Sequence, residues 1–184
     1  MPNKLKNKYK VIENQKYGFK SVIPLPSIEE INEYYANEFY NGDYKKINDS
    51  SKEVQLEDIE QYSMWWDHMW DVANKQFRKS NKNIESIIDV GCGWGLMLIH
   101  YMKTKKINGF GFDPAPEAIE FLKQSGIDGV VSGFENMEKL NKKFDVVFLN
   151  NVLEHLLDPV DVMNDINKNL LLNDGIIIID VPNE

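Results

Sequence analysis

The chain has 184 residues, of which 42% are hydrophobic and 27% charged, a size and composition typical of one globular domain. Its single cysteine, Cys92, excludes an internal disulfide and a zinc site built from several cysteines. The formal net charge of −8 disfavours binding to phosphate backbones, and no apolar run approaches the roughly 20 residues that span a bilayer. We therefore expect a cytoplasmic protein without a membrane or nucleic-acid partner.

The first elements expected in chain order are a hairpin and a helix. Short runs at residues 9–12 and 18–23 could pair as the two strands of a small hairpin. Pro24 and Pro26 follow the second run and would end the pairing there. Ser27 and Glu30 have capping-box spacing, which predicts a helix that runs from Ser27 toward Tyr40.

A second, aromatic-rich helix is predicted over residues 53–77, because its apolar side chains recur at helical spacing. This helix carries Trp65, Trp66 and Trp70 and could roof an active site and select an apolar or planar acceptor, but we favour core packing for Trp66 and Met69. We interpret His68 and His100 as residues on helix surfaces.

Strands and helices alternate in the second half of the chain, a pattern typical of parallel α/β proteins. Strands are expected at residues 86–90, 107–113, 129–132, 144–149 and 175–181, and helices at 96–103, 115–124 and 159–171. Right-handed crossovers would give a Rossmann-like, doubly wound, mostly parallel sheet with helices on both faces and ligand sites at the carboxyl ends of its strands. We therefore expect a core domain at 84–184, preceded by a helical cap segment at 1–83.

A glycine-rich turn, Gly91-Cys92-Gly93-Trp94-Gly95, follows the first of these core strands. Glycines admit positive φ and close approach of a ligand to the backbone, and two ligands compete for such a turn: a dinucleotide and S-adenosylmethionine. The spacing is Gly-x-Gly-x-Gly instead of Gly-x-Gly-x-x-Gly, and Asp89 precedes the loop. A carboxylate there would repel a pyrophosphate but suits the ammonium group of S-adenosylmethionine.

Asp113 ends the next predicted strand, and Pro114 turns the chain after it. An acid at this position accepts hydrogen bonds from both ribose hydroxyls of an adenosine cofactor. The pair Asp89 and Asp113 therefore favours S-adenosylmethionine, with NAD as the less favoured alternative.

These motifs together resemble the class I S-adenosylmethionine-dependent methyltransferases, in particular the small-molecule group that includes ubiquinone-biosynthesis O-methyltransferases. The resemblance covers about residues 84–184. The matching segments are the Asp-Val-Gly-Cys-Gly-Trp-Gly loop, the strand end at 109–114, the strand at 144–147, the segment at 150–156, and Val-Pro-Asn at 181–183.

The resemblance implies a cofactor site distributed over several strand ends. Asp89, Gly91 and Gly93 would hold the amino-acid end of the cofactor, Asp113 its ribose, Phe134 and Glu135 its adenine, and Asn150 and Asn151 its methionine moiety, with Cys92, Trp94 and Pro114 in the same site. Many relatives carry an acid that contacts the adenine amino group. This chain has Ser132-Gly133-Phe134-Glu135 there, so either Glu135 replaces that acid or the contact is lost.

His155 is the candidate catalytic residue, because it follows the fourth core strand at the functional edge and can serve as a base near neutral pH. The alternative is a histidine that caps or packs beneath the next helix. Glu154 and His155 are adjacent, but two ligands do not make a metal site, so we expect no metal.

We expect methyl transfer to a small-molecule acceptor, with an oxygen as the candidate atom, and leave a homo-oligomer open. Class I methyltransferases normally continue after the fifth strand with a helix and two more strands, whereas this chain stops at Glu184. We therefore expect either a fragment of a longer protein or an edge strand covered in another way. A non-catalytic cofactor-binding or interaction module is the alternative function.

Overall fold

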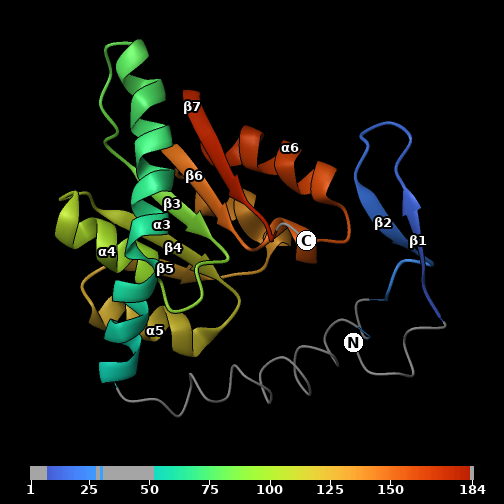
Figure 1. Cartoon of the computed structure of the whole chain (residues 1–184), viewed down its shortest axis with the longest axis horizontal. Helices are drawn as coiled ribbons and strands as arrows, with labels where there is room; N and C mark the ends of the chain where they lie inside the picture. The colour runs from blue at the N-terminus through green and yellow to red at the C-terminus, as the bar shows by residue number, and fades with distance from the viewer. Residues whose placement is uncertain (1–7, 28–29, 31–51, 183–184) are drawn as a thin grey trace. The chain divides into compact units, whose positions relative to one another are not determined.

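The computed structural model describes residues 8–27, 30 and 52–182, in two units that comprise residues 1–51 and 52–184 (Figure 1). The first unit contains the predicted hairpin, with strands β1 (Lys10–Glu13) and β2 (Lys20–Ile23) paired antiparallel. The capping box is present: Ser27 N donates to Glu30 Oε2 at 3.0 Å and Glu30 N to Ser27 Oγ at 3.2 Å. The helix predicted beyond it lies outside the described residues.

The second unit contains one five-stranded sheet in the order β5-β4-β3-β6-β7, and each pair of neighbouring strands is parallel. The strands are β3 (Ile87–Val90), β4 (Gly109–Asp113), β5 (Asp128–Val131), β6 (Phe144–Asn150) and β7 (Leu171–Asp180). The chain runs outward from β3 to β5, then crosses to β6 and β7 on the other side. The predicted α/β fold class, a Rossmann-like parallel sheet, is confirmed.

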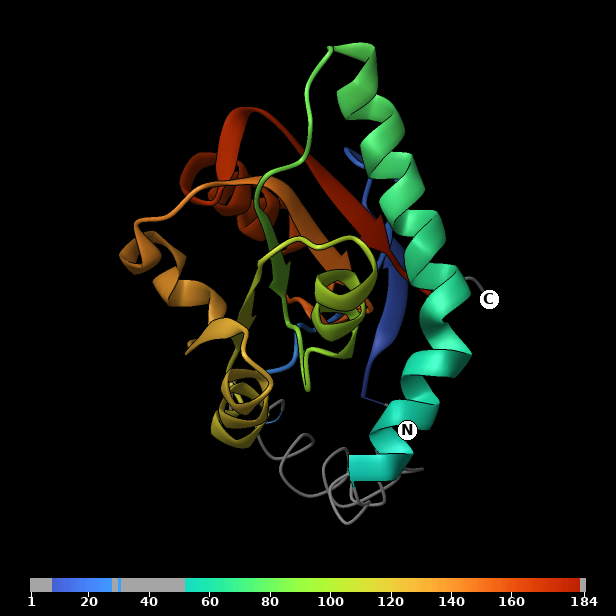
Figure 2. The ribbon, with the colours of Figure 1, turned by 90° about the vertical axis from the view of Figure 1, so that its left-hand side faces the viewer.

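Helices connect these strands and cover both faces of the sheet (Figure 2). They are α3 (Lys52–Lys79), α4 (Leu96–Thr104), α5 (Pro116–Gln124) and α6 (Pro159–Asn169), with short 3-10 turns η2 (Phe134–Leu140) and η3 (Leu153–His155). Side chains from α3, α4 and α5 pack on one face, and those from η2 and α6 pack on the other. No described helix is both long enough and apolar enough to cross a membrane.

The last strand begins four residues earlier than the sequence predicts. Leu171 pairs with Phe144, the register then shifts, and regular pairing resumes at Ile176 opposite Val146. Leu170 and Leu171 are both buried. Helix α6 ends at Asn169 and β7 begins at Leu171, although the helical spacing of apolar residues predicts a helix as far as Leu171.

Helices α3 and α4 are joined by polar contacts as well as by apolar packing. The Tyr101 hydroxyl, which is fully buried, donates to the Trp66 carbonyl at 2.5 Å. Asp67 Oδ1 lies 3.0 Å from His100 Nε2 and 2.6 Å from Lys105 Nζ. These two partners, Lys105 first, hold the pKa of Asp67 below its usual value.

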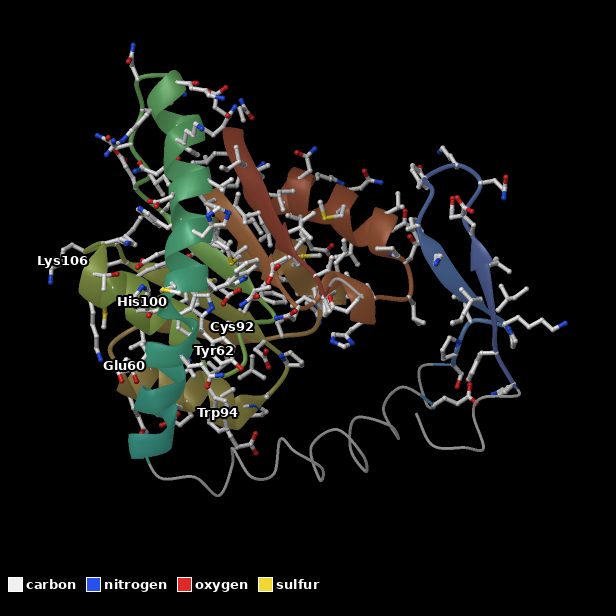
Figure 3. All side chains as sticks on the ribbon, viewed as in Figure 1. Glu60, Tyr62, Cys92, Trp94, His100 and Lys106 are labelled. Carbon is white, nitrogen blue, oxygen red and sulfur yellow. The ribbon has the colours of Figure 1, made fainter. Side chains whose placement is uncertain are left out.

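The prediction that His100 lies on a helix surface is therefore wrong. Its side chain is buried between the two helices, beside the Trp66 ring at a centroid distance of 5.8 Å (Figure 3). Because one face of α4 packs on α3, the polar residue that sits there is satisfied by Asp67 instead of water. His68 is exposed, as predicted, and Trp66 and Met69 are buried core residues, as predicted.

Candidate active site

The predicted site residues gather at the carboxyl ends of the parallel strands. Asp113, Asn150 and Asp180 are the last residues of β4, β6 and β7, and Asp89 is one residue from the end of β3. Parallel pairing places Asn150 opposite Asp180 and Asp89 opposite Gly111. One edge of the sheet therefore collects carboxylate and amide side chains from four strands, as expected for a ligand site of this fold.

The glycine loop connects β3 to α4 through three residues in the left-handed region. Gly91, Gly93 and Gly95 have φ values of 77°, 50° and 67°. Gly91 N donates to the Phe112 carbonyl at 2.7 Å, which ties the loop to β4, and Gly95 is the cap residue from which α4 starts. Glycine is needed here for backbone conformation, whatever ligand is bound.

Packing gives a second reason for glycine at two of these positions. A Cβ on Gly91 would lie 2.5 Å from Val152 Cγ2, and one on Gly95 would lie 2.3 Å from Leu122 Cδ1. Val152 follows β6 and is buried, so the loop after β6 packs directly on the glycine loop. The space that a side chain at Gly91 would need is already filled by protein.

Gly91→Ala is expected to destabilise the fold by about 2–4 kcal/mol, because it adds a steric clash to the cost of positive φ. Gly126→Ala is the matched control: Gly126 has a φ of 84°, but no atom lies within 4 Å of the position that a Cβ would take there. Chemical denaturation of both variants measures the two effects. Equal losses of stability would contradict a role for the Val152 contact.

Asp113 is buried and both of its carboxylate oxygens accept backbone hydrogen bonds. Gly93 N donates to Oδ2 and Ala115 N donates to Oδ1, each at 2.8 Å. Burial raises the pKa of Asp113, and the two N–H donors oppose that rise. The carboxylate is thus fixed between the glycine loop and the start of α5, and each oxygen keeps a lone pair for a further donor.

Asp89 is also buried, but its Oδ1 atom has no hydrogen-bond partner among the described residues. Burial, followed by the charge of Asp113, raises the pKa of Asp89 to about 8. A buried acceptor without a donor is costly in a folded protein. Asp89 therefore has the capacity to accept a hydrogen bond from a cationic ligand group.

The other residues of the loop region pack mainly against protein. The Trp94 ring meets the Phe121 ring edge-on at a centroid distance of 5.6 Å. Cys92 Sγ fills the space beside Gly111, 2.9 Å from where a Cβ of that glycine would stand, and burial raises the pKa of its thiol. Pro114 is exposed between β4 and α5.

Phe134 and Glu135 begin η2, next to the end of β5. The Phe134 ring is half-buried and lies 6.3 Å from the Phe112 ring, centroid to centroid. Ser132 N donates to the Asp113 carbonyl at 3.0 Å, so this segment is fastened to the end of β4. The side chain of Glu135 lies outside the described part of the structure, and its role at the adenine stays a prediction.

Asn150 and Asn151 end β6 with a sharp turn, since Asn151 has a φ of 54°. Asn151 Nδ2 donates to Asn150 Oδ1 at 3.2 Å, and Asn151 N donates to the Asp180 carbonyl at 2.9 Å. The turn is therefore held by the end of β7.

His155 ends η3, at the same edge of the sheet, and is exposed to solvent. Its Nε2 atom lies 3.8 Å from Glu154 Oε1. Within residues 8–27, 30 and 52–182, no group of three or more His, Cys, Asp and Glu side chains could hold a metal ion.

One contact at this edge, made by the aromatic helix that the sequence analysis considered as a roof of the active site, was not predicted. Trp65 of α3 donates its indole N–H to Asp180 Oδ2 at 2.9 Å, across 115 positions of the chain. No local pattern distinguishes Trp65 from Trp66, which packs in the core one position later. The helical period turns Trp65 away from the stripe that contains Trp66 and Met69, but it does not reveal the distant partner Asp180.

A family model described as a methyltransferase domain matches residues 60–184, about two thirds of the chain. The chain belongs to this methyltransferase domain family. The match includes most of α3, the whole sheet and the glycine loop. The enzyme class predicted from the sequence, a methyltransferase, is thereby confirmed.

Solved methyltransferases share this domain's fold. The plantazolicin methyltransferase BpumL, in complex with a monoazolic desmethylPZN analog and S-adenosylhomocysteine, superimposes with a TM-score of 0.58 over 81% of this chain and 55% of its own, at 17% identity. An S-adenosylmethionine-dependent methyltransferase from Clostridium acetobutylicum gives 0.53 over 82% and 55%, at 18% identity.

Curated relatives of the domain are named tRNA U34 carboxymethyltransferase. The protein from Campylobacter jejuni is 28% identical over 100 residues, which cover 51% of this chain and 34% of that protein. The protein from Nautilia profundicola is 27% identical over 107 residues, covering 55% and 35%. The alignment thus spans about a third of the length of these relatives.

The prediction of a small-molecule acceptor and no nucleic-acid partner is contradicted by these relatives, whose name specifies tRNA. The prediction relied on the net charge of −8. A net charge is a sum over the whole chain, whereas an acceptor meets only the few side chains at one surface.

Proposed function

We propose that this methyltransferase domain transfers a methyl group from S-adenosylmethionine to a base of tRNA. The proposal that S-adenosylmethionine binds here depends on the buried Oδ1 atom of Asp89, which has no hydrogen-bond partner among the described residues. Asp113, on the neighbouring strand, has a carboxylate whose two oxygens each accept one backbone N–H. The relatives named for tRNA support the acceptor part.

The residues at the strand ends fit the two polar ends of the cofactor. Asp89 would accept a hydrogen bond from the ammonium group, which supplies the donor that Oδ1 lacks. Asp113 would accept from the ribose hydroxyls with the lone pairs that Gly93 N and Ala115 N leave available. Two strand ends, β3 and β4, would thus fix the cofactor along the edge.

When bound, S-adenosylmethionine supplies an activated methyl group that leaves by in-line displacement, so the domain has mainly to hold the acceptor in line. Asn150 and Asn151 would border the methionine moiety from the end of β6. His155, on the turn after β6, would take the proton that an acceptor oxygen or nitrogen loses.

The test is transfer of radioactive methyl from S-adenosylmethionine to unfractionated tRNA by the purified 184-residue chain, with nuclease digestion to locate the label in a nucleoside. Label in a tRNA nucleoside is the expected result. Binding of S-adenosylhomocysteine without label in any RNA would overturn the acceptor while leaving the cofactor assignment in place.

A further inference from the structure

The aromatic helix α3 reaches the candidate active site at Trp65. The indole Nε1 donates to Asp180 Oδ2 at 2.9 Å, and the backbone carbonyl of Asp180 accepts from Asn151 N at the same distance. A chain of two hydrogen bonds therefore connects α3 with the turn after β6, beside the proposed methionine position.

The Trp65 indole is hydrogen-bonded through its N–H group, and yet the side chain remains exposed to solvent. Its side chain is 52% exposed, whereas the adjacent Trp66 is 6% exposed and belongs to the core. A tryptophan that serves only for packing buries its large ring, as Trp66 does. Trp65 instead has its orientation fixed by Asp180 while much of its ring surface remains accessible.

Two further aromatic side chains, Tyr62 and His68, lie beside Trp65 on the same face of α3. Tyr62 and His68 lie three residues before and after Trp65, a spacing that places them on neighbouring positions of one helix face. The Trp65 and His68 rings have centroids 6.1 Å apart, and Tyr62 is 49% exposed. Figure 3 shows Tyr62 on α3 and Trp94 of the glycine loop toward the same end of this unit.

The strand order places Trp65 on the acceptor side. The strand order is β5-β4-β3-β6-β7. If the adenine lies beyond β5, the ribose at Asp113 on β4, the ammonium group at Asp89 on β3 and the methionine moiety at the end of β6, the end of β7 is the strand end that the cofactor leaves open. Asp180, to which Trp65 is bonded, ends β7. An acceptor that approaches the methyl group over the end of β7 therefore passes this indole.

We propose that Trp65 is the platform on which the acceptor base stacks, with Asp180 as the residue that positions the indole. This inference rests on the proposed tRNA acceptor. Stacking suits an RNA base on an acidic protein, because every base has a planar face and stacking needs no phosphate contact. Stacking thus offers a contact to a nucleic-acid base that does not depend on attraction to phosphate.

The test measures binding of a short uridine-containing single-stranded RNA to the chain saturated with S-adenosylhomocysteine. Trp65→Leu is expected to weaken RNA binding by about tenfold or more, as stacking on one aromatic side chain contributes about 1–3 kcal/mol. Trp65→Phe keeps a ring but loses the N–H bond to Asp180, so we expect an intermediate loss. Met64→Leu is the matched control, since Met64 is the neighbouring residue and is 83% exposed.

Thermal unfolding and the affinity for S-adenosylhomocysteine are measured for each variant, and both should remain at the wild-type value. RNA affinity that is equal in Trp65→Leu and the wild type would overturn the role of Trp65 and leave the tRNA acceptor standing. A wild-type chain that binds S-adenosylhomocysteine but no RNA would overturn the acceptor and this inference together.

Discussion

Replacement of Asp113 by alanine is expected to weaken the binding of S-adenosylhomocysteine by about 100-fold or more. Hydrogen bonds to a charged group contribute roughly 1.5–3 kcal/mol each, and the proposed role of Asp113 includes two of them, to the ribose hydroxyls. The variant also leaves Gly93 N and Ala115 N without the acceptors that now fix the glycine loop. Isothermal titration calorimetry of the folded chain measures the change.

Methylthioadenosine, which has the ribose but no amino-acid end, is the matched ligand for this experiment. Its affinity should fall in parallel with that of S-adenosylhomocysteine, because both ligands carry the hydroxyl groups that Asp113 would hold. Asp113→Asn should lose less, since one amide oxygen still accepts a backbone N–H. Affinity for both ligands within about threefold of the wild-type value in a folded Asp113→Ala variant would remove Asp113 from the site.

Asp89→Asn is expected to weaken the binding of S-adenosylhomocysteine while it raises the stability of the free domain at pH 8. Burial and the neighbouring Asp113 raise the pKa of Asp89 to about 8, so near pH 7 the free domain holds this carboxyl largely protonated. Binding of an ammonium group favours the carboxylate and releases that proton. Affinity for S-adenosylhomocysteine should therefore rise as pH increases from about 6 toward 8.

Asp89→Asn should lose this pH dependence and bind S-adenosylhomocysteine at least about tenfold more weakly at pH 8, by the loss of one charge-assisted hydrogen bond. Methylthioadenosine again supplies the control, because it lacks the ammonium group and should bind both proteins alike at every pH. A variant that weakens both ligands equally would mean that Asp89 does not face the amino-acid end.

The effect on unfolding has the opposite sign. Because the pKa of Asp89 is higher in the folded than in the unfolded chain, the folded state binds more protons between about pH 4 and pH 8, and this group makes stability fall as pH rises through that window. Asp89→Asn should therefore raise the melting temperature relative to wild type at pH 8 and change it little at pH 5. A difference that is the same at both pH values would contradict the raised pKa.

The parts of the fold that the sequence predicted are those that depend on local chemistry. Short β-branched runs, the glycine loop and an acid at the end of β4 are each readable within a few residues, and the parallel sheet follows from their order. The boundaries of the core strands moved by at most a few residues, most at the start of β7. There Leu170 and Leu171 are buried in the core on either side of the helix–strand boundary, and apolar spacing alone does not tell a buried helix end from a buried strand start.

The parts that the sequence did not predict depend on contacts between distant segments. His100 is buried because Asp67, 33 positions earlier, supplies its hydrogen bond, and Trp65 reaches the end of β7 because its indole N–H finds Asp180, 115 positions later. The acceptor could not be predicted from net charge. The recognisable motifs belong to the cofactor end, and a sum over the chain does not describe one surface.

The contacts between α3 and α4 have a consequence for how such a domain changes its target. The Tyr101 hydroxyl and the Asp67 carboxylate brace α3 against the helix that begins at the glycine loop. Sliding α3 to accommodate another molecule would therefore disturb the cofactor end as well. A change of acceptor, by evolution or by engineering, is therefore easiest through substitution of exposed side chains such as Tyr62 and Trp65, with the position of α3 against α4 unchanged.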